Sequence, residues 1–371
     1  MKTYRAAVIG LGRMGSTFDD EMDRGISIFI PYCHTPAYVA SAHVELVAGA
    51  DPHEGQRAVY AERWGLPAER VYEDYRTMLE REDLDLVSVC TSARFRPGIV
   101  EHVARSGVRA IWAEKPMAFS LAEADNMVQV CADNSVTLAV NCARRYNPYL
   151  TRASEMIQGG DLGEIYQISA LFDCQLSHNG SHGIDTMRYL VGGDVEWVFG
   201  EMESDEKAAG DEDLSGNGYF AFDNGVRGYL RSMTVGPTGE EFDVVGSKGR
   251  FRALAGCQIF EHYTAVSGGR LDALQMAQVP FPLPVNIPGS GLTIVSDLIE
   301  AAETGRPARC SGEDGCKALE IAIALRESHR RGGVRVDLPV ADRSLRIVSA
   351  EALRDHLPAR VRGELAAAKS S

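Results

Sequence analysis

Short apolar runs alternate with stretches of helical spacing along the first part of the chain. The runs are rich in the Val, Ile, Leu and Ala residues that buried strands need, and they lie at 4–9, 44–50, 83–90, 108–113 and 136–140. Helical spacing follows at 54–64, at 97–105 and after Ser120, where Glu123 completes a capping box. This alternation predicts an α/β fold with a doubly wound parallel sheet.

The pattern changes after Pro148. A helix is expected at 149–157 and a strand at 165–172. Further β-prone runs then follow one another closely, at 195–199, 218–222, 226–233, 240–245 and 250–254. Residues 223–225 (Asp-Asn-Gly) are a hairpin signal between two of these runs. Consecutive strands with short turns predict a mostly antiparallel sheet in a second domain of α+β type.

Two amphipathic helices are predicted near the end of the second domain, at 293–304 and 313–331, after an irregular Pro-rich stretch at 281–288. We therefore expect a first domain at 1–147, a second at 148–341 and a charged, Ala-rich tail at 342–371.

Two segments do not fit these patterns of strands and helices. Residues 18–35 are too long for a simple helix-to-strand link, and we interpret them as an inserted loop near a ligand or substrate mouth, or equally as a surface excursion or subunit contact. Residues 201–213 are acidic and are expected to be a solvated face.

The composition excludes several classes of protein. The chain has 371 residues, 45% of them hydrophobic, and a formal net charge of −14, which argues against nucleic acid and anionic membranes as partners. No apolar run has the length of a membrane span, and the immediate entry into a strand argues against a signal peptide. Eight cysteines without a C-x-x-C pair favour free thiols in a reducing compartment, so a cytoplasmic protein is expected.

The first strand runs into a G-x-G-x-x-G turn, which consists of Gly10, Leu11, Gly12, Arg13, Met14 and Gly15. The first glycine permits the sharp turn, the second lets a pyrophosphate approach the backbone, and the third lets the next helix pack against the sheet. Free N–H groups at the start of that helix would face the anion. The turn therefore predicts a dinucleotide site, although the same residues could form a plain βα turn.

Asp51 ends the second strand, where a carboxylate accepts both ribose hydroxyls of NAD and repels the 2′-phosphate of NADP. We therefore expect NAD, with NADP less favoured; the alternative for Asp51 is an ordinary helix N-cap. Thr91 and Ser92 follow a later strand, at the edge where such folds bind ligands, and could contact the ribose or phosphate. Arg94 and Arg96 lie just beyond and could meet a phosphate or an anionic substrate.

Glu114 and Lys115 end another strand, before Pro116, which could be cis. At that point a lysine projects into the cleft that would hold the nicotinamide, so both residues are expected to border the cofactor. Lys115 could also hydrogen-bond a substrate hydroxyl and lower its pKa. The alternative is a surface lysine that begins a loop.

A second set of polar residues lies at 178–185. If this stretch is helical, His178, His182 and Asp185 share one stripe at i, i+4 and i+7. They could act in acid–base catalysis, bind a divalent metal or belong to a solvated helix face. The cationic Lys115 nearby would oppose a metal, so none is expected.

These motifs, together with residues 145–148 (Arg-Tyr-Asn-Pro) and 180–185, resemble those of the Gfo/Idh/MocA family. The resemblance implies an N-terminal Rossmann domain and a C-terminal α/β domain with a large open sheet that is often used for oligomerisation, here into a homodimer or homotetramer. It also implies NAD(P)-linked chemistry on a sugar or cyclitol hydroxyl. Lys115 and His182 match the family's catalytic lysine and histidine, and Asp185 matches a residue that contacts substrate hydroxyls.

The chain departs from the family pattern at two places. His178 stands where many dehydrogenase members have Asp, and residues 91–96 (Thr-Ser-Ala-Arg-Phe-Arg) replace T-P-x-x-x-H. The first change leaves open whether His178 or His182 accepts the proton.

The hypothesis from the sequence is an NAD-dependent oxidoreductase that acts on a secondary hydroxyl of a sugar, sugar derivative or cyclitol. His182, relayed by His178, would take the proton and Lys115 would hold the oxygen, while Asp185, Asn141, Arg145 and Tyr146 would bind other hydroxyls. The alternatives are a redox-neutral, NAD-retaining glycoside-cleaving enzyme that acts through a 3-keto sugar, and a non-catalytic sugar-sensing protein.

Overall fold

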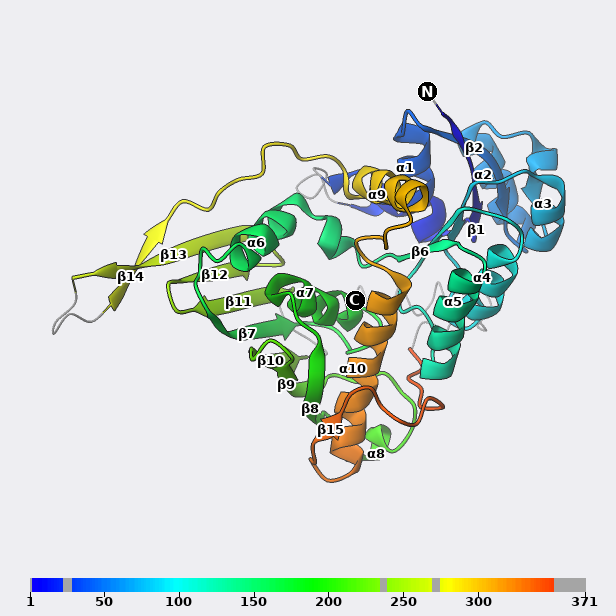
Figure 1. The fold of residues 1–371 in the computed structure, drawn as a ribbon. Coiled ribbons are helices and arrows are strands. Elements are labelled where there is room, and N and C mark those ends of the chain that lie inside the picture. Colours follow the sequence, from blue (N-terminus) through cyan, green and yellow to red (C-terminus); the bar gives the residue numbers. More distant parts are fainter. Residues whose placement is uncertain (1, 23–28, 234–238, 269–273, 350–371) are drawn as a thin grey trace, which may run out of the picture.

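The computed structural model describes residues 2–22, 29–233, 239–268 and 274–349. In this part of the chain the strands form two separate sheets, one parallel and one mostly antiparallel. Figure 1 shows the parallel sheet with its helices at one end of the molecule and the antiparallel sheet at the other, with helix α10 (Gly312–Arg330) between them.

The first sheet has six strands in the order β3-β2-β1-β4-β5-β6, which is the doubly wound order that the sequence predicts. Its strands are β1 (Tyr4–Ile9), β2 (Val44–Ala50), β3 (Val71–Tyr72), β4 (Leu86–Val89), β5 (Ala110–Ala113) and β6 (Thr137–Val140). All pairings are parallel, so the carboxyl ends of the strands meet at one edge. The two-residue strand β3 is not predicted from the sequence.

Helices cover this sheet, namely α1 (His34–Ala40), α2 (Glu54–Trp64), α3 (Tyr75–Arg81), α4 (Arg96–Ala104) and α5 (Leu121–Asp133). The capping box of Ser120 and Glu123 is present at the start of α5, as predicted. The helix expected after the glycine turn is only one π-helical turn, η1 (Arg13–Thr17), followed by one 3₁₀ turn, η2 (Phe18–Glu21). Two more 3₁₀ turns are η4 (Ala68–Arg70) and η5 (Ala143–Tyr146).

The second sheet has nine strands in the order β14-β13-β12-β11-β7-β10-β9-β8-β15. They are β7 (Ile165–Phe172), β8 (Val195–Met202), β9 (Gly216–Phe222), β10 (Arg227–Ser232), β11 (Glu241–Gly246), β12 (Gly249–Leu254), β13 (Ile259–Ser267), β14 (Leu274–Val279) and β15 (Val336–Asp337). One pair, β7 with β10, is parallel and the others are antiparallel. Residues 223–225 lie in the short turn that joins β9 to β10, which is the predicted hairpin.

Helices pack on one face of this sheet and between the two sheets. They are α6 (Pro148–Gln158), α7 (Gly180–Val191), α8 (Asp205–Ala208), α9 (Ser290–Thr304) and α10. Helix α10 contacts β8 and α7 on one side and α5 and β6 on the other, and α9 packs on α1 (Figure 1). One buried apolar cluster therefore runs through both halves. Across the described residues, no helix has both the length and the apolar character needed to cross a membrane.

Candidate active site

A cavity of about 1730 Å³ lies at the carboxyl edge of the parallel sheet and extends to the second sheet. Its lining combines the glycine turn, strand-end residues of the first sheet, the segment before α7, and β13 with the chain that follows β14. Ligands of doubly wound sheets bind at this edge. The cavity therefore lies where this fold is expected to bind its ligand.

The glycine turn has the geometry that a dinucleotide cradle requires. Gly10 has φ +90°, and a Cβ on Gly15 would lie 2.1 Å from the Gly10 carbonyl oxygen. A Cβ on Gly12 would meet nothing within 4 Å, so the turn is open at that point, and Gly12, Arg13 and Met14 line the cavity. These residues fit a pyrophosphate laid along the turn.

Asp51 is tied to this turn. The Leu11 N–H donates to Asp51 Oδ2 at 3.0 Å, and the His53 N–H donates to Asp51 Oδ1 at 2.9 Å. The carboxylate is buried at the end of β2 beside the turn. Arg57 donates to the Asp51 and Pro52 carbonyl oxygens, so its guanidinium braces the β2–α2 loop.

Two hydroxyls at the end of β4 also fit a bound ligand. Thr91 Oγ1 and Ser92 Oγ are buried, line the cavity and have no hydrogen-bond partner among the described residues. Buried polar groups are normally paired, so these hydroxyls are suited to ligand oxygens. Arg96, which the sequence offered for a phosphate or anionic substrate, instead donates to the Thr91 and Pro116 carbonyl oxygens and so holds two strand-end loops together.

Glu114 is a buried anchor for the strand ends. His34 Nε2 lies 3.0 Å from its carboxylate, and the Asn141 side-chain amide donates to the same oxygen at 2.5 Å. Burial opposes ionisation, but the hydrogen bond from His34 and the charges of Lys115 and Arg96 lower the pKa of Glu114 to about 2. The carboxylate is thus ionised, and the Oδ1 atom of Asn141, a cavity-lining residue, has no partner among the described residues.

Lys115 connects the two halves of the site. The Lys115–Pro116 peptide bond is cis, and both residues line the cavity. The Lys115 ammonium donates to the Asn179 side-chain oxygen at 2.9 Å and to the His178 carbonyl oxygen at 3.2 Å. A lysine from the first sheet thus reaches the segment that precedes α7.

The predicted stripe of His178, His182 and Asp185 is not one face of a helix. Helix α7 begins at Gly180, so His178 lies in the turn before the helix and His182 lies in its first turn. Both histidines line the cavity. Among the described residues, His182 Nδ1 is buried without a hydrogen-bond partner. Burial, followed by the charges of Lys115, Arg144 and His178, holds the pKa of His182 well below 6.5. The imidazole of His182 is therefore neutral at neutral pH and can accept a proton.

Asp213 stabilises the turn that contains His178. Its carboxylate accepts the Ser177 N–H at 2.8 Å and the His178 N–H at 2.7 Å. Burial raises the pKa of Asp213 to about 6, although the two N–H donors oppose the shift. The expectation of a solvated acidic face at 201–213 is wrong at this residue, because Asp213 turns inward to bind backbone donors.

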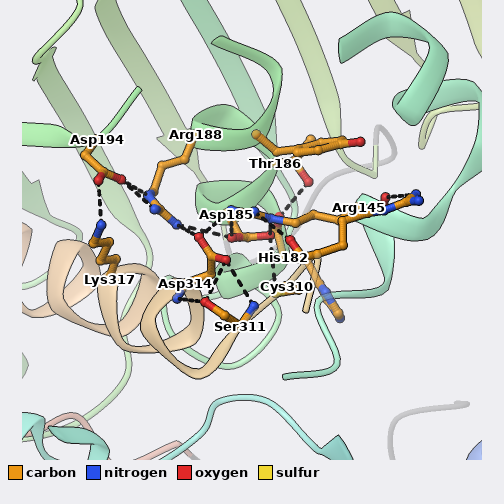
Figure 2. Close-up of polar contacts among 12 residues, drawn as sticks. Arg145, His182, Asp185, Thr186, Arg188, Asp194, Cys310, Ser311, Asp314 and Lys317 are labelled. Atoms are coloured by element: carbon orange, nitrogen blue, oxygen red, sulfur yellow. Dashed lines mark hydrogen bonds and ion pairs between the residues drawn. The ribbon is translucent and has the colours of Figure 1, made fainter. Parts of the chain in front are cut away.

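Arg145 and Asp185 belong to a buried polar network next to the site (Figure 2), and Tyr146, which follows Arg145 in η5, is buried as well. Both oxygens of Asp185 accept from Arg145, at 2.8 and 2.7 Å, and Tyr146 donates to Asp297 at 3.0 Å. The network continues to other charged residues, namely Arg188, Asp194, Asp314 and Lys317. The sequence predicts that Arg145, Tyr146 and Asp185 hold substrate hydroxyls. In the structure they lie outside the described lining of the cavity and are already paired with protein groups.

One group in this network brings three potential metal ligands together. Cys142, Asp185 and Cys310 are buried, with ligand atoms within 4.8 Å of one another, and it is the sole such group in the described part of the chain. Its carboxylate is occupied by Arg145. Asp185 is thus paired with Arg145 and lies outside the cavity lining that His178 and His182 share, so these three residues do not come together as one group of ligands in the described part of the chain.

Several cavity residues are not predicted from the sequence. Arg144 donates to Glu240 at 2.8 Å, and this pair lines the cavity beside Tyr32. The neighbouring motif at 145–148 draws attention to Arg145, yet it is Arg144 that faces the site. Phe18, Met22, Phe29 and Tyr32 also line the cavity, which agrees with the interpretation of 18–35 as an insertion near the mouth; residues 23–28 of it lie outside the described residues.

Comparison with known proteins agrees with this geometry. Residues 4–142 match "Oxidoreductase family, NAD-binding Rossmann fold", and residues 173–338 match "Oxidoreductase family, C-terminal alpha/beta domain". The chain belongs to this family, the Gfo/Idh/MocA oxidoreductases, as its motifs suggested.

Two curated relatives span nearly the whole chain. The scyllo-inositol 2-dehydrogenase (NAD(+)) of Bacillus subtilis is 25% identical over 355 residues, which cover 88% of this chain and 94% of that protein. The D-apiose dehydrogenase of Paraburkholderia graminis is 25% identical over 358 residues, which cover 90% of this chain and 89% of that protein. Among solved structures, an inositol dehydrogenase homolog from Azotobacter vinelandii, complexed with NADH and myo-inositol, has a TM-score of 0.71 at 18% identity over 91% of this chain and 98% of that chain, which shows a shared fold.

Proposed function

We propose that this protein is an NAD-dependent oxidoreductase that transfers a hydride between the nicotinamide and a secondary hydroxyl of a sugar, sugar derivative or cyclitol. The observation that carries the proposal is the convergence of Lys115 and His182 on the cavity that also contains the open glycine turn. Family membership and the sugar and inositol dehydrogenases among its relatives support the same reading.

The chain supplies a proton acceptor and a cationic hydrogen-bond donor. When bound, NAD accepts or returns the hydride at its nicotinamide. The neutral imidazole of His182 takes the hydroxyl proton during oxidation. The ammonium of Lys115 binds the same oxygen and stabilises the negative charge that develops on it. His178 lies beside both groups at the cavity wall and serves as a second proton carrier.

Other residues bind and orient. Thr91 and Ser92 offer their buried hydroxyls to the cofactor, and Asp51 selects NAD over NADP through the ribose next to the glycine turn. Asn141 offers a side-chain oxygen at the cavity wall, and Glu114 fixes that amide and the strand end that carries Lys115. Asp185 and Arg145 act as positioning residues, because they hold α7 and η5 together behind the site, and Tyr146 positions η5 against α9 through its hydrogen bond to Asp297.

A substrate panel tests this function. Inositols, pentoses, hexoses and their glycosides are mixed with enzyme and either NAD or NADP, and the reduced cofactor is followed by absorbance while products are identified by mass spectrometry. We expect NADH to form with at least one polyol or sugar. Free sugar and aglycone without net NADH would instead indicate the redox-neutral reaction, and cofactor binding with no turnover of any compound would indicate a sensing protein.

The outer face of the second sheet supports assembly into a homodimer or homotetramer. Three aromatic residues are paired across neighbouring strands, namely Phe199 on β8, Tyr219 on β9 and Tyr229 on β10. Their side chains lie on the face of the sheet opposite to that of the buried residues next to them in each strand. Their rings lie 6.4 and 5.3 Å apart, and Phe199 and Tyr229 are 37% and 45% exposed. A row of exposed aromatic rings is typical of a protein interface. Sedimentation of wild type and Tyr229→Lys would test it, with dissociation expected in the variant.

A reducing compartment, such as the cytoplasm, is consistent with the cysteines. All eight lie in the described part of the chain and are free thiols. Proteins of oxidising compartments usually pair such residues.

A further inference from the structure

The end of the cavity farthest from the glycine turn is lined by stacked aromatic rings. Tyr149 and Phe260 have ring centroids 5.0 Å apart and planes within 3° of parallel. Phe281 stacks on Phe260 at 5.4 Å. We call these three residues the aromatic platform. All three line the same cavity as Lys115 and His182.

A buried ring packs behind two members of the platform. Phe251, which is fully buried in β12, lies 6.4 Å from Phe260 and 5.7 Å from Phe281. The chain that carries Phe281 runs from β14 back to α9 (Figure 1), and it is fastened where the Gly291 N–H donates to the Pro31 carbonyl oxygen at 2.8 Å.

Apolar side chains extend the platform toward solvent. Ile259 is 52% exposed and Leu283 is 69% exposed, and both line the cavity. Neither side chain is needed to fill the core, since both face open space. Together with the platform they form an apolar wall at the cavity mouth, where a polyol alone would find few hydrogen-bond partners.

The part of the cavity between the catalytic residues and the platform is polar. Arg144 and Glu240 pair there at 2.8 Å, and the pair offers donors and acceptors to sugar hydroxyls. Glu240 also neutralises Arg144, so this region is poorly suited to a diphosphate. The cavity thus contains the proposed catalytic residues, then the polar pair of Arg144 and Glu240, and then the apolar wall.

On this basis, and resting on the proposed function, we infer that the substrate is a glycoside: its sugar ring reacts at Lys115 and His182, and its planar apolar aglycone lies on Phe260 and Phe281. Phe260, Phe281 and Leu283 line this part of the cavity with apolar side chains, which suit the aryl group of an aglycone. Apolar burial and ring stacking would favour the aryl glycoside.

The test compares matched phenyl and methyl glycosides. Binding of each to NAD-loaded wild-type enzyme is measured by calorimetry, and kcat/KM is measured wherever NADH or free phenol forms. For the sugar that the enzyme accepts, we expect the phenyl glycoside to bind at least about tenfold more tightly than the methyl glycoside, the size of one ring-stacking contact together with its burial. A disaccharide and UDP-glucose serve as the other two probes.

Two variants and a control assign the effect to the platform. Phe260→Ala should reduce the phenyl-to-methyl ratio to near one. Leu283→Ser, at a position that is 69% exposed and contributes little to the core, should reduce it about threefold. Val285→Ser is the matched control, because Val285 is fully exposed on the same segment but lies outside the described cavity lining, and its ratio should equal that of wild type.

Equal affinity for phenyl and methyl glycosides would overturn the inference, and so would the absence of binding by any phenyl glycoside. Tighter binding of the disaccharide or UDP-glucose that depends on Phe260 would assign the platform to a second sugar or a nucleotide base, and would overturn it too. A shift in oligomeric state in Leu283→Ser would assign the wall to a second copy of the chain. A failure of the proposed function can be told apart from a failure of this inference. It would appear as no turnover of any compound, while calorimetry would still report the ratio of phenyl to methyl glycoside affinity.

Discussion

Arg145 donates to both carboxylate oxygens of Asp185, at 2.8 and 2.7 Å, and the Asp185 side chain is fully buried. The pair links η5 to α7, so it joins the end of the parallel sheet to the helix that carries His182. Burial raises the pKa of Asp185, whereas the Arg145 charge opposes that shift. The bond therefore makes Asp185 a fixed part of the frame around the cavity.

Breaking this pair should destabilise the protein. Arg145→Met leaves Asp185 buried with the longer contact to Arg188, at 3.4 Å, and a weak contact to the Cys310 thiol, so we expect the free energy of unfolding to fall by about 3 kcal/mol. Urea unfolding followed by circular dichroism measures the change. Arg152→Met is the control, because Arg152 forms an exposed pair with Glu155 and should cost less than about 0.5 kcal/mol. A normal stability of Arg145→Met combined with a large rise in substrate KM would show that Arg145 binds substrate instead.

The fold follows closely from the sequence where the hydrophobic signal is strong. Buried strands such as β1 and β4 have nearly continuous apolar runs, and Gly65 and Ser120 mark helix ends by local chemistry. The strands β3 and β15 have two residues each, too few for a pattern. Strand β13 has intermediate or exposed side chains along its whole length, so it lacks the alternation that marks a half-buried strand.

The candidate site is predictable only in part. Lys115 and His182 stand out because strand ends and short motifs are local features. Helical spacing could not show which side of α7 faces the cavity, because almost every residue of this helix is buried. Asp213 and Glu240 are not predicted from the sequence, because their partners His178 and Arg144 are distant along the chain and no local pattern indicates such contacts.

Lys115→Met should lower kcat by on the order of 100-fold, because it removes one charged donor from the reacting oxygen. NAD binding, followed by quenching of intrinsic fluorescence, should persist in this variant. Lys207→Met is the control, since Lys207 is exposed on α8 away from the cavity. A kcat within a few-fold of wild type would contradict the assigned role of Lys115.

The pH profile should report the neutral state of His182. Because burial and the neighbouring cations depress its pKa, the folded protein keeps His182 unprotonated below pH 6.5, and the acid limb of kcat/KM for alcohol oxidation should lie below that value. Lys115→Met removes one of those cations, so the His182 pKa should rise and the residual acid limb should move to higher pH. Titration of the His182 ring by NMR checks the direction, and an unchanged pKa in the variant would exclude the electrostatic coupling.

Asp213 should act by positioning the turn that contains His178. Asp213→Ala removes the acceptor of the Ser177 and His178 N–H groups, and we expect kcat/KM to fall on the order of tenfold as two buried donors lose their partner. Asp213→Asn keeps one acceptor oxygen and should recover part of the loss. Equal activity of both variants, at either the wild-type or the reduced value, would rule out this hydrogen-bonding role.

Asp51 should determine the choice between NAD and NADP. Its carboxylate is held beside the glycine turn by the Leu11 and His53 N–H groups, so it is placed to accept ribose hydroxyls and to repel a 2′-phosphate. Asp51→Ala should lower kcat/KM with NAD by about tenfold or more, the value of a hydrogen bond to a charged group, and should raise the NADP-to-NAD ratio because the repulsion is lost. Asp51→Asn separates the two effects: it keeps acceptor oxygen near Leu11 but removes the charge, so the ratio should rise with a smaller loss of NAD activity. If the ratio stays constant in both variants, Asp51 serves the turn alone and cofactor choice depends on other residues of the cavity.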